Sequence, residues 1–470
     1  MVKIIPIILS GGKGLRLWPL SRKQLPKQFI KIPFDEKYTL FQKTILDFKS
    51  EIYDLPIIIG SVENRFLIKE QLDEIRVKPK EIILEHQSKN TAAPICIAAI
   101  QCLKAYNDAL MLILPSDHYF PKRKTYFNSD FFKSIKTNFS YHTIFGLKTT
   151  YPNTELGYIK EKTTKNSRIL GEVDQFFEKP NLEEAKKFHK NNKFFFNSGM
   201  FFLKPSKILN EFKKINSNFY KNAERSIDNS YRDLGFTFLD KVFFKKIKPI
   251  SFDYLILEKI KNLYVRKINY KWSDLGSWES IIELMNKDNS NNYILAKKKE
   301  EKNVSNSLVI SDKEFNLFSS LDNLLIVNID NALLVSSREK SHEIKEILNK
   351  KKTEDFQYGQ IDYRPWGNFK IVEKGSKYIV KKLTIKPGAR ISSQKHMHRC
   401  EHWTVVNGKA KVIKNEKNII LKKNESIYIP KNTKHCIINP YKKKLEIIEI
   451  QIGDVISEDD IIRFEDPYKR

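Results

Sequence analysis

The chain has 470 residues, and its 84 Lys and Arg against 56 Asp and Glu give a formal net charge of +28. This length predicts two or three domains, because a domain usually holds about 100–200 residues. The hydrophobic content of 41% supplies a core for each domain and excludes a disordered protein. Four cysteines are too few for a disulfide framework, so we expect a cytoplasmic protein.

The positive charge alone would favour a nucleic-acid or an anionic membrane partner. Its make-up argues against both, because 69 of the 84 basic residues are Lys and only 15 are Arg. Arg is the side chain favoured at phosphate forks and base edges. The lysines are also scattered along the chain, and no apolar run is long enough for a membrane span. We therefore expect neither a nucleic-acid nor a membrane partner.

The first 115 residues alternate short apolar runs with segments of helical spacing. The expected buried strands are Ile4–Leu9, Pro56–Ile59, Glu81–Leu84 and Leu110–Leu114, and the expected helices are Leu40–Phe48, a segment through Phe66 and Leu72, and Thr91–Tyr106. The alternation predicts βαβ units and a Rossmann-like α/β domain with a mixed, mostly parallel sheet. Such sheets bind ligands at the carboxyl ends of their strands. The residues just after Leu9 and Leu114 are therefore candidate site residues.

The composition changes near residue 286. Residues 286–306 are polar and indicate a connector. Short β-like runs at Ser307–Ile310, Leu324–Ile329 and Ala332–Val335 and a helix at Ser341–Lys350 follow. Beyond Tyr358, short apolar runs such as Tyr378–Ile385, separated by Gly, Pro or Asn turns, predict an all-β sandwich or barrel. We predict three parts: an α/β domain at 1–285, a β-rich connector at 286–355 and an all-β domain at 356–470.

A glycine-rich segment directly follows the first predicted strand. Glycines let a backbone approach an anion closely and turn its N–H groups toward it, and basic side chains add charge suited to a triphosphate. The segment lacks the Gly-Lys-Ser/Thr ending of a Walker loop, and by itself it could be an ordinary βα turn. The residues expected at the phosphates are Gly11, Gly12, Lys13, Gly14, Arg16 and Lys27.

This segment and a series of later motifs resemble the mannose-1-phosphate guanylyltransferases, a family of sugar nucleotidyltransferases. The motifs follow one another in order over residues 1–280. They are Gly11-Gly12-Lys13-Gly14, Pro26-Lys27-Gln28-Phe29, Asn90-Thr91-Ala92, Leu114-Pro115-Ser116-Asp117-His118, Phe145-Gly146, Gly157-Tyr158, Glu178-Lys179-Pro180, Asn197-Ser198-Gly199 and Trp272-Ser273-Asp274.

The resemblance implies that a mannose 1-phosphate oxygen attacks the α-phosphorus of GTP, which gives GDP-mannose and pyrophosphate. It implies that Asp117 and Asp274 hold Mg²⁺, a cation that prefers carboxylate and phosphate oxygens. A turn or cap role is the alternative for each Asp. Catalytic roles are implied for Arg16, Lys27 and Lys179, nucleotide contacts for Asn90, Thr91 and Asp117, and sugar or sugar-phosphate contacts for Gly157, Glu178, Lys179, Asn197 and Asp274.

Histidines cluster in the last part of the chain. Three of the nine, His396, His398 and His402, lie within seven residues, and His435 follows a later turn. Residues i and i+2 of a strand point the same way, so Gln394, His396 and His398 can line one side of a barrel. Nitrogen and carboxylate ligands suit Zn²⁺, Co²⁺, Mn²⁺ or Fe²⁺. A surface patch of histidines is the alternative.

Residues 356–467 resemble the type II phosphomannose isomerase domain, which is a cupin. The matching motifs are Arg364-Pro365-Trp366-Gly367, Gln394-x-His396, Arg399-x-Glu401-His402-Trp403, Ile429-Pro430, His435, Asn439-Pro440 and Glu458-Asp459-Asp460. The resemblance implies a cupin barrel that interconverts fructose 6-phosphate and mannose 6-phosphate. It implies a metal held by Gln394, His396, Glu401 and His435.

Other roles in the cupin stay open at this point. His398 is either a fifth ligand or a neighbour of the ligands, and Arg399 would bind the substrate phosphate or stabilise enediolate charge. His398, Glu401 and His402 are all candidates for the base. We expect a bifunctional enzyme that supplies GDP-mannose for polysaccharide biosynthesis. The alternative is a guanylyltransferase whose cupin is silent or regulatory, and the oligomeric state is open.

Overall fold

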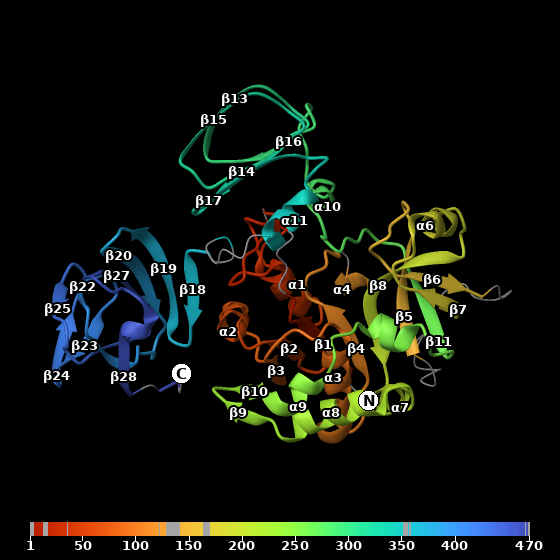
Figure 1. Cartoon of the computed structure of the whole chain (residues 1–470), viewed down its shortest axis with the longest axis horizontal. Coiled ribbons are helices and arrows are strands. Elements are labelled where there is room, and N and C mark those ends of the chain that lie inside the picture. The colour runs from red at the N-terminus through yellow and green to blue at the C-terminus, as the bar shows by residue number, and fades with distance from the viewer. Residues whose placement is uncertain are drawn as a thin grey trace. The chain divides into compact units, whose positions relative to one another are not determined.

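The computed structural model describes residues 4–12, 17–34, 36–121, 123–127, 142–162, 170–350, 356, 359–465 and 467–468. Three predicted phosphate-binding residues, Lys13, Gly14 and Arg16, lie outside the described residues. The chain divides into two compact units, Met1–Lys352 and Thr353–Arg470 (Figure 1). The connector belongs to the first unit, and the three-part division stays a prediction.

The centre of the first unit is a run of parallel strands. β1 (Ile5–Ser10) lies between β4 (Met111–Pro115) and β2 (Ile57–Ser61), and β3 (Glu81–Glu85) and β10 (Phe236–Phe238) continue the order. The central strands are almost entirely buried, which explains why they read as continuous apolar runs in the sequence. Their carboxyl ends meet at one edge of the sheet.

The rest of this eleven-stranded sheet is largely antiparallel. β8 pairs in antiparallel fashion with β4, β5 and β6, and β5 and β11 form a further parallel pair. The sheet is therefore mixed, as predicted. The remaining strands are β5 (His142–Lys148), β6 (Tyr158–Glu161), β7 (Leu170–Phe177), β8 (Phe194–Leu203), β9 (Tyr231–Asp233) and β11 (Leu263–Ile268).

Helices pack against this sheet. α3 is apolar almost all round and contacts α7 and α8, so it is buried in the main core of the unit. The longer helices are α1 (Leu40–Leu46), α2 (Arg65–Glu74), α3 (Ala92–Ala105), α6 (Leu182–His189), α7 (Pro205–Ile215) and α8 (Ser217–Asp228). The shorter ones are η2 (Lys27–Phe29), α4 (Arg123–Tyr126), α9 (Lys241–Lys246), η3 (Asp253–Leu257) and α10 (Trp278–Ile282).

The connector is a small stack of parallel strands. Tyr293 lies opposite Leu308, which lies opposite Leu325, so successive passes of the chain stack in register, as in a solenoid. Its elements are β12 (Tyr293–Leu295), β13 (Lys298–Ser305), β14 (Leu308–Ser311), β15 (Phe315–Asp322), β16 (Leu324–Ile329), β17 (Ala332–Ser337) and α11 (Glu343–Lys350). The sequence predicted β14, β16, β17 and α11 but missed β12, β13 and β15.

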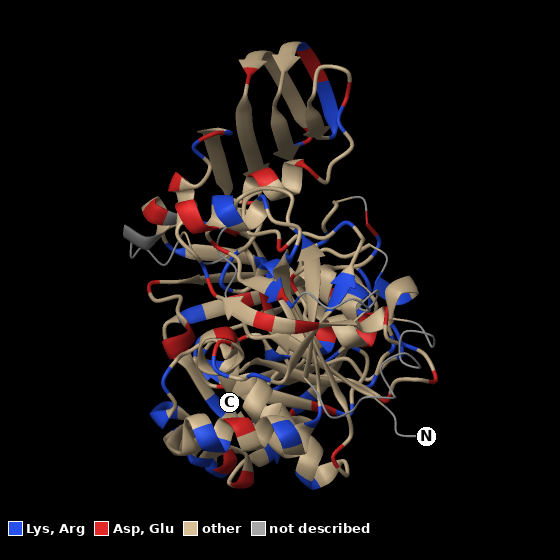
Figure 2. Cartoon of the chain, turned by 90° about the vertical axis from the view of Figure 1, so that its right-hand side faces the viewer, with Lys and Arg blue, Asp and Glu red and all other residues tan. Residues whose placement is uncertain are grey.

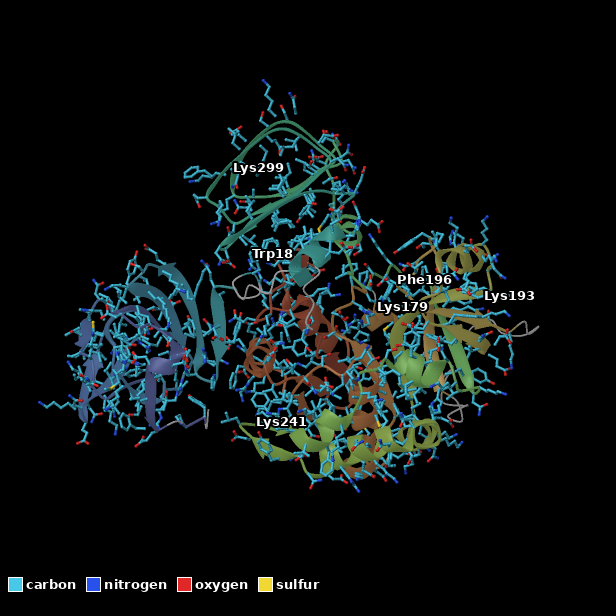
Figure 3. All side chains as sticks on the ribbon, in the orientation of Figure 1. Trp18, Lys179, Lys193, Phe196, Lys241 and Lys299 are labelled. Carbon is cyan, nitrogen blue, oxygen red and sulfur yellow. The ribbon has the colours of Figure 1, made fainter. Side chains whose placement is uncertain are left out.

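The apolar side of the connector packs on the first domain. Leu308 and Leu325 share a core with Leu17 and Trp18, which follow the glycine-rich segment directly. Figure 3 labels Trp18 at this junction. The connector therefore braces the chain next to the predicted phosphate loop.

The second unit is formed by two antiparallel sheets. Their strand orders are β18-β19-β20-β27-β22-β25 and β24-β23-β26-β21-β28, and an apolar core that includes Trp366 and Trp403 fills the barrel. The elements are β18 (Ile361–Arg364), β19 (Gly367–Lys374), β20 (Tyr378–Ile385), β21 (Ser393–His396), β22 (Arg399–Asn407), β23 (Ala410–Lys414), β24 (Lys417–Leu421), β25 (Ser426–Ile429), β26 (His435–Ile438), β27 (Leu445–Gly453), η4 (Glu458–Asp460) and β28 (Ile461–Glu465). The predicted fold class is confirmed.

Charged side chains are spread over the described residues. Basic and acidic segments are interspersed along the helices and strands in Figure 2. None of the helices among the described residues combines the length and the apolar character that crossing a membrane requires.

The packing of the connector gives a stability prediction. Leu325 is fully buried on β16, so Leu325→Ala should lower the free energy of unfolding of the first unit by about 2–5 kcal/mol. Leu333 is 58% exposed on the neighbouring β17, and Leu333→Ala should change it by less than about 0.5 kcal/mol. Denaturant unfolding of both variants measures the difference. Equal losses would show that the connector core does not stabilise the unit.

Candidate functional site

The carboxyl ends of the parallel strands open onto a pocket of about 320 Å³. Several residues predicted from separate motifs line it together: Gly11, Gly12, Asn90, Thr91 and Asp117. The Thr91 hydroxyl accepts a hydrogen bond from the Phe252 amide at 2.8 Å, so it fixes a neighbouring loop. The expectation that the segments after β1 and β4 meet at one site agrees with this arrangement.

The start of the glycine-rich segment is held in place by Gln28. This side chain is buried on η2, and its Nε2 donates hydrogen bonds to the Ser10 carbonyl at 3.1 Å and the Gly12 carbonyl at 3.2 Å. Because these carbonyls point toward Gln28, Gln28 fixes the backbone around Gly11 and Gly12. The motif contained Gln28, but its positioning role was not predicted.

Lys27 joins the Asp117 segment to the Asp274 segment. Its Nζ lies 3.0 Å from Asp117 Oδ2 and donates to the Asp274 carbonyl at 2.6 Å. Burial by itself raises the pKa of Asp117, but the charge of Lys27, and then that of His118, lower it to about 2. Tyr119 and Ser273 also exchange two backbone hydrogen bonds, so the segments are adjacent. Asp117 is therefore ionised at neutral pH, as a metal ligand must be.

The two predicted magnesium ligands line different pockets. Asp274 lines a second pocket of about 720 Å³ with Tyr151, Trp272 and Glu283, and its Oδ1 accepts a hydrogen bond from the Gly276 amide at 3.1 Å. Asp117 lines the first pocket instead. Lys27 thus joins the segments that carry Asp117 and Asp274. That both residues bind one magnesium ion stays a prediction.

The predicted sugar-binding residues Gly157, Glu178 and Asn197 lie around the half-buried carboxyl groups of Glu178 and Asp253. A Cβ atom on Gly157 would lie 2.7 Å from Glu178 Oε2, so only glycine leaves room for that carboxyl group. The Asn197 amide donates to Asp253 Oδ1 at 2.7 Å. Burial, and then the charge of Asp253, raise the pKa of Glu178 to about 8, and burial raises that of Asp253 to about 6. Lys179 follows Glu178 with a positive φ of 48°, and Asp253 was not predicted.

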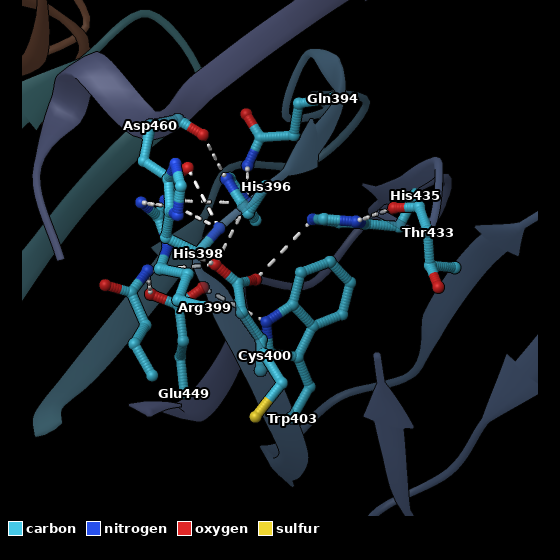
Figure 4. A network of polar contacts seen from close by, with 12 residues as sticks. Gln394, His396, His398, Arg399, Cys400, Trp403, Thr433, His435, Glu449 and Asp460 are labelled. Atoms are coloured by element: carbon cyan, nitrogen blue, oxygen red, sulfur yellow. Dashed lines mark hydrogen bonds and ion pairs between the residues drawn. The ribbon is translucent and has the colours of Figure 1, made fainter. Parts of the chain in front are cut away.

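In the second unit, three predicted ligands, His396, Glu401 and His435, converge on one point. Figure 4 labels two of them, His396 and His435. Glu401 Oε1 lies 3.1 Å from His396 Nε2, and Glu401 Oε2 lies 3.5 Å from His435 Nε2. All three side chains are buried, and Glu401 Oε2 and His435 Nε2 have no hydrogen-bond partner among the described residues.

Backbone carbonyls fix the orientation of both imidazole rings. His396 Nδ1 lies 3.1 Å from the Asp460 carbonyl, and His435 Nδ1 lies 2.9 Å from the Thr433 carbonyl. Because a carbonyl only accepts, each Nδ1 carries the hydrogen and each Nε2 keeps its lone pair for a metal. Glu401 Oε2 and His435 Nε2 have no hydrogen-bond partner among the described residues, and the site offers nitrogen and carboxylate donors. These features fit a divalent transition metal.

Gln394 lies beside these three ligands. Its Nε2 is 3.3 Å from His396 Nε2, and its Oε1 accepts from the Ser392 hydroxyl at 3.1 Å. As a ligand it would have to present Oε1, which a rotation of the amide by about 180° provides. Gln394 is thus well placed, and its coordination stays a prediction.

Two other histidines lie away from this centre. β21 ends at His396. The strand alternation that was expected to bring His398 to the same side therefore ends before His398, and His398 is exposed. His402 is exposed on the opposite side of β22 from Glu401, with its ring centroid 4.7 Å from that of Tyr428. The structure therefore corrects the expectation that Gln394, His396 and His398 share one side.

A basic pocket adjoins the metal-ligand cluster. Arg399 is buried there, with Nε 3.3 Å from Glu401 Oε1 and Nη1 donating to the Ser457 carbonyl at 2.9 Å. The other cations that line this pocket are Arg364, Lys381 and Arg463. Four cations in one pocket are suited to a phosphate group.

Glu449 lines the same pocket and was not predicted. Its Oε1 accepts from Trp403 Nε1 at 3.0 Å, and its Oε2 accepts from Gln451 Nε2 at 3.0 Å. Burial, and then the charge of Glu401, raise the pKa of Glu449 to about 7. Alternation along β27 places Glu449 and Gln451 on the buried face. The alternating sequence of this strand could therefore have predicted that Glu449 is buried.

Known proteins resemble both units in the same order. The nucleotidyl transferase family matches residues 5–291, and the C-terminal region of mannose-6-phosphate isomerases matches residues 351–466. A mannose-1-phosphate guanylyltransferase of Salmonella montevideo is 36% identical over 99% of this chain and 100% of its own length. The chain belongs to the mannose-1-phosphate guanylyltransferase family.

Further relatives agree with this membership, and one solved structure shares the fold of the first unit. The xanthan biosynthesis protein XanB of Xanthomonas campestris pv. campestris is 35% identical over 100% of both chains. The alginate biosynthesis protein AlgA of Pseudomonas aeruginosa is 34% identical over 99% of this chain and 97% of its own. The crystal structure of mannose-1-phosphate geranyltransferase from Thermus thermophilus matches with a TM-score of 0.61 and 21% identity, covering 74% of this chain and 99% of that one. That likeness shows the fold of the first unit.

For this guanylyltransferase family member, the ligand cluster of the second unit gives a direct prediction. His435→Ala should abolish binding of one divalent transition-metal ion per chain, because it removes one of three converging ligands. Equilibrium dialysis of chelator-treated protein against Co²⁺, followed by metal analysis, measures the loss. The matched control is His402→Ala, which changes an exposed histidine and should keep the ion. Retention of the ion by the His435 variant would refute the proposed ligand set.

Proposed function

We propose that the first unit makes GDP-mannose and pyrophosphate from GTP and mannose 1-phosphate, and that the second unit interconverts fructose 6-phosphate and mannose 6-phosphate. One observation carries this proposal. A nucleotidyl transferase match and a mannose-6-phosphate isomerase match follow one another in a chain that spans its relatives over nearly their whole length. Relatives named for xanthan and alginate biosynthesis support polysaccharide synthesis as the use of the product.

The first unit would work by positioning and charge neutralisation. A sugar-phosphate oxygen forms a bond to the α-phosphorus of GTP while the bond from that phosphorus to the bridging β-oxygen breaks, and pyrophosphate leaves. Gly11 and Gly12, together with Lys13, Gly14 and Arg16, would bind the triphosphate. Mg²⁺ held by Asp117 and Asp274 would neutralise phosphate charge.

Lys27 and the carboxyl cluster would complete this site. Lys27 keeps the Asp117 and Asp274 segments in register, so its loss should disturb both. The half-buried Glu178, with its raised pKa, can donate and accept hydrogen bonds with sugar hydroxyl groups, and the Asn197 amide is held by Asp253. Lys179, next in the chain to Glu178, would contact the phosphate of the sugar.

The second unit has the groups that an aldose–ketose isomerase needs. A divalent Zn²⁺, Co²⁺, Mn²⁺ or Fe²⁺ ion held by Gln394, His396, Glu401 and His435 would polarise the C1 and C2 oxygens of the sugar. Arg364, Lys381, Arg399 and Arg463 would bind the phosphate. His398 and His402 are exposed, and Glu401 would be a metal ligand. Glu449 lines the pocket, and we propose that it moves the proton between C1 and C2. Both reactions use soluble phosphorylated substrates, which agrees with a cytoplasmic location.

Nucleotide and sugar choice test the first activity. GTP, ATP, UTP and dTTP are each offered with mannose 1-phosphate and with glucose 1-phosphate in the presence of Mg²⁺, and pyrophosphate release is followed. GTP with mannose 1-phosphate should be the best pair. Rapid turnover confined to dTTP and glucose 1-phosphate would refute the proposed guanylyl transfer.

The role of Asp117 gives a second test of the same activity. Asp117→Asn should lower kcat at least about 100-fold, because the amide cannot supply the charge that a metal ligand needs. Asp228→Asn changes an exposed partner of Lys104 and should leave the rate unchanged. Near-normal turnover by the Asp117 variant would refute its metal role.

Glu449 gives the test of the second activity. Glu449→Gln should abolish isomerisation of fructose 6-phosphate while the metal content and pyrophosphate release stay unchanged. The control is Glu446→Gln, which changes an outward-facing residue of the same strand and should keep isomerisation. Absence of isomerisation in the metal-loaded unmodified chain would instead favour a guanylyltransferase with a silent or regulatory cupin.

A further inference from the structure

The second unit contains a buried carboxyl group that has no part in the proposed isomerisation. Asp460 is the last residue of η4, 64 positions after His396, and its side chain is only 1% exposed. A buried carboxylate costs free energy unless hydrogen bonds and a cation satisfy it. Asp460 has both kinds of partner, and all of them come from the short stretch of chain that carries the metal-ligand cluster.

The hydrogen bonds come from the turn between two strands of the site. β21 ends at His396 and β22 begins at Arg399, so the turn consists of two residues. Asp460 Oδ1 accepts from the Met397 amide at 3.0 Å and from the His398 amide at 3.2 Å. Figure 4 shows Asp460 beside His396 and His398. Asp460 therefore fixes the turn that joins a proposed metal ligand to Arg399.

The cation that faces Asp460 is Arg399. Its Nη1 lies 3.5 Å from Asp460 Oδ2 and donates to the Ser457 carbonyl at 2.9 Å. Its Nε lies 3.3 Å from Glu401 Oε1, so the guanidinium lies between two buried carboxyl groups. If the charge on η4 were removed, the attraction of Glu401 would remain and would draw the guanidinium toward the ligand cluster. The charge of Asp460 thus balances that of Glu401 and sets the position of Arg399.

The backbone of Asp460 acts on the ligand cluster at the same time. Its carbonyl accepts from His396 Nδ1 at 3.1 Å. The next residue, Ile461, begins β28 and lies opposite His396 on β21, so strand pairing holds that carbonyl in place. Groups that orient metal ligands in this way typically cost about 10- to 100-fold in metal affinity or activity when they are lost.

We propose that Asp460 is a positioning residue of the isomerase site, whose carboxylate holds Arg399 at the substrate phosphate and whose carbonyl orients His396; this inference rests on the proposed isomerisation. The two tasks use different atoms, so a change of the side chain separates them. Asp460→Asn keeps the carbonyl and one oxygen acceptor for the turn amides. It removes the charge and turns N–H donors toward the Arg399 guanidinium, which has only donors itself.

Two constants report on the position of Arg399: KM for fructose 6-phosphate, and Ki for inorganic phosphate as a competitive inhibitor of isomerisation. We would measure both, together with kcat, on the full chain loaded with Co²⁺. In Asp460→Asn both constants should rise about 10-fold, as expected for a weakened hydrogen bond to a charged group, while kcat changes little. Equilibrium dialysis should still find one Co²⁺ per chain in the second unit, because the carbonyl still orients His396.

Asp459→Asn is the matched control. Asp459 precedes Asp460 in the same short helix but is exposed, so KM, Ki and the Co²⁺ content should stay as in the unmodified chain. Neither KM nor Ki depends on the fraction of the protein that is active, so partial unfolding cannot imitate the expected shift. Pyrophosphate release from GTP and mannose 1-phosphate should be the same in both variants, because that reaction belongs to the first unit.

The outcomes separate this inference from the proposed function. Unchanged KM and Ki in Asp460→Asn, or a fall in kcat alone, would overturn the hold on Arg399 while isomerisation still stands. Loss of Co²⁺ together with isomerisation would show that the side chain supports the barrel itself, and would also overturn it. If the unmodified chain loaded with Co²⁺ does not isomerise fructose 6-phosphate, the proposed function of the second unit fails and this inference fails with it.

Discussion

A single buried ammonium group organises the transferase site. Lys27 Nζ contacts the Asp117 carboxylate and the Asp274 carbonyl, so residues far apart in the sequence become neighbours. The pair is only partly buried at Asp117, and its main effect is on ionisation and geometry: Asp117 stays charged, and the Asp274 segment is held against it. Exchange of Lys27 for an uncharged residue would remove the countercharge and free both segments together.

The loop that faces the substrates is supported from two sides. Gln28 binds the carbonyls of Ser10 and Gly12 from η2, next to Lys27 in the chain. On the other side, Trp18 is packed between the first domain and the connector strands. A glycine-rich segment has high conformational entropy, so these fixed ends reduce the freedom that binding of a triphosphate would otherwise have to remove. The connector thus has a physical link to the site although it supplies no predicted ligand.

Local patterns predicted the parts of the fold that have a buried face. The parallel strands β1 to β4 and the cupin strand β20 carry runs or alternations of apolar residues, and each lies within one or two residues of its prediction. β13 was not predicted because its charged residues are exposed on both faces. Among the described residues, it pairs with β15. His398 was misplaced because strand alternation holds only up to the end of β21. Asp253 gave no motif signal, since its role depends on contact with Asn197, more than 50 positions away.

The two sites share a physical feature that local sequence patterns do not carry. Glu85 Oε1 in the first unit, and Glu401 Oε2 with His435 Nε2 in the second, are buried polar atoms without hydrogen-bond partners among the described residues. Folded proteins rarely bury such atoms, because each one costs about 1–3 kcal/mol. Where such atoms converge on one point, as Glu401 Oε2 and His435 Nε2 do, a bound metal that satisfied them would recover that free energy.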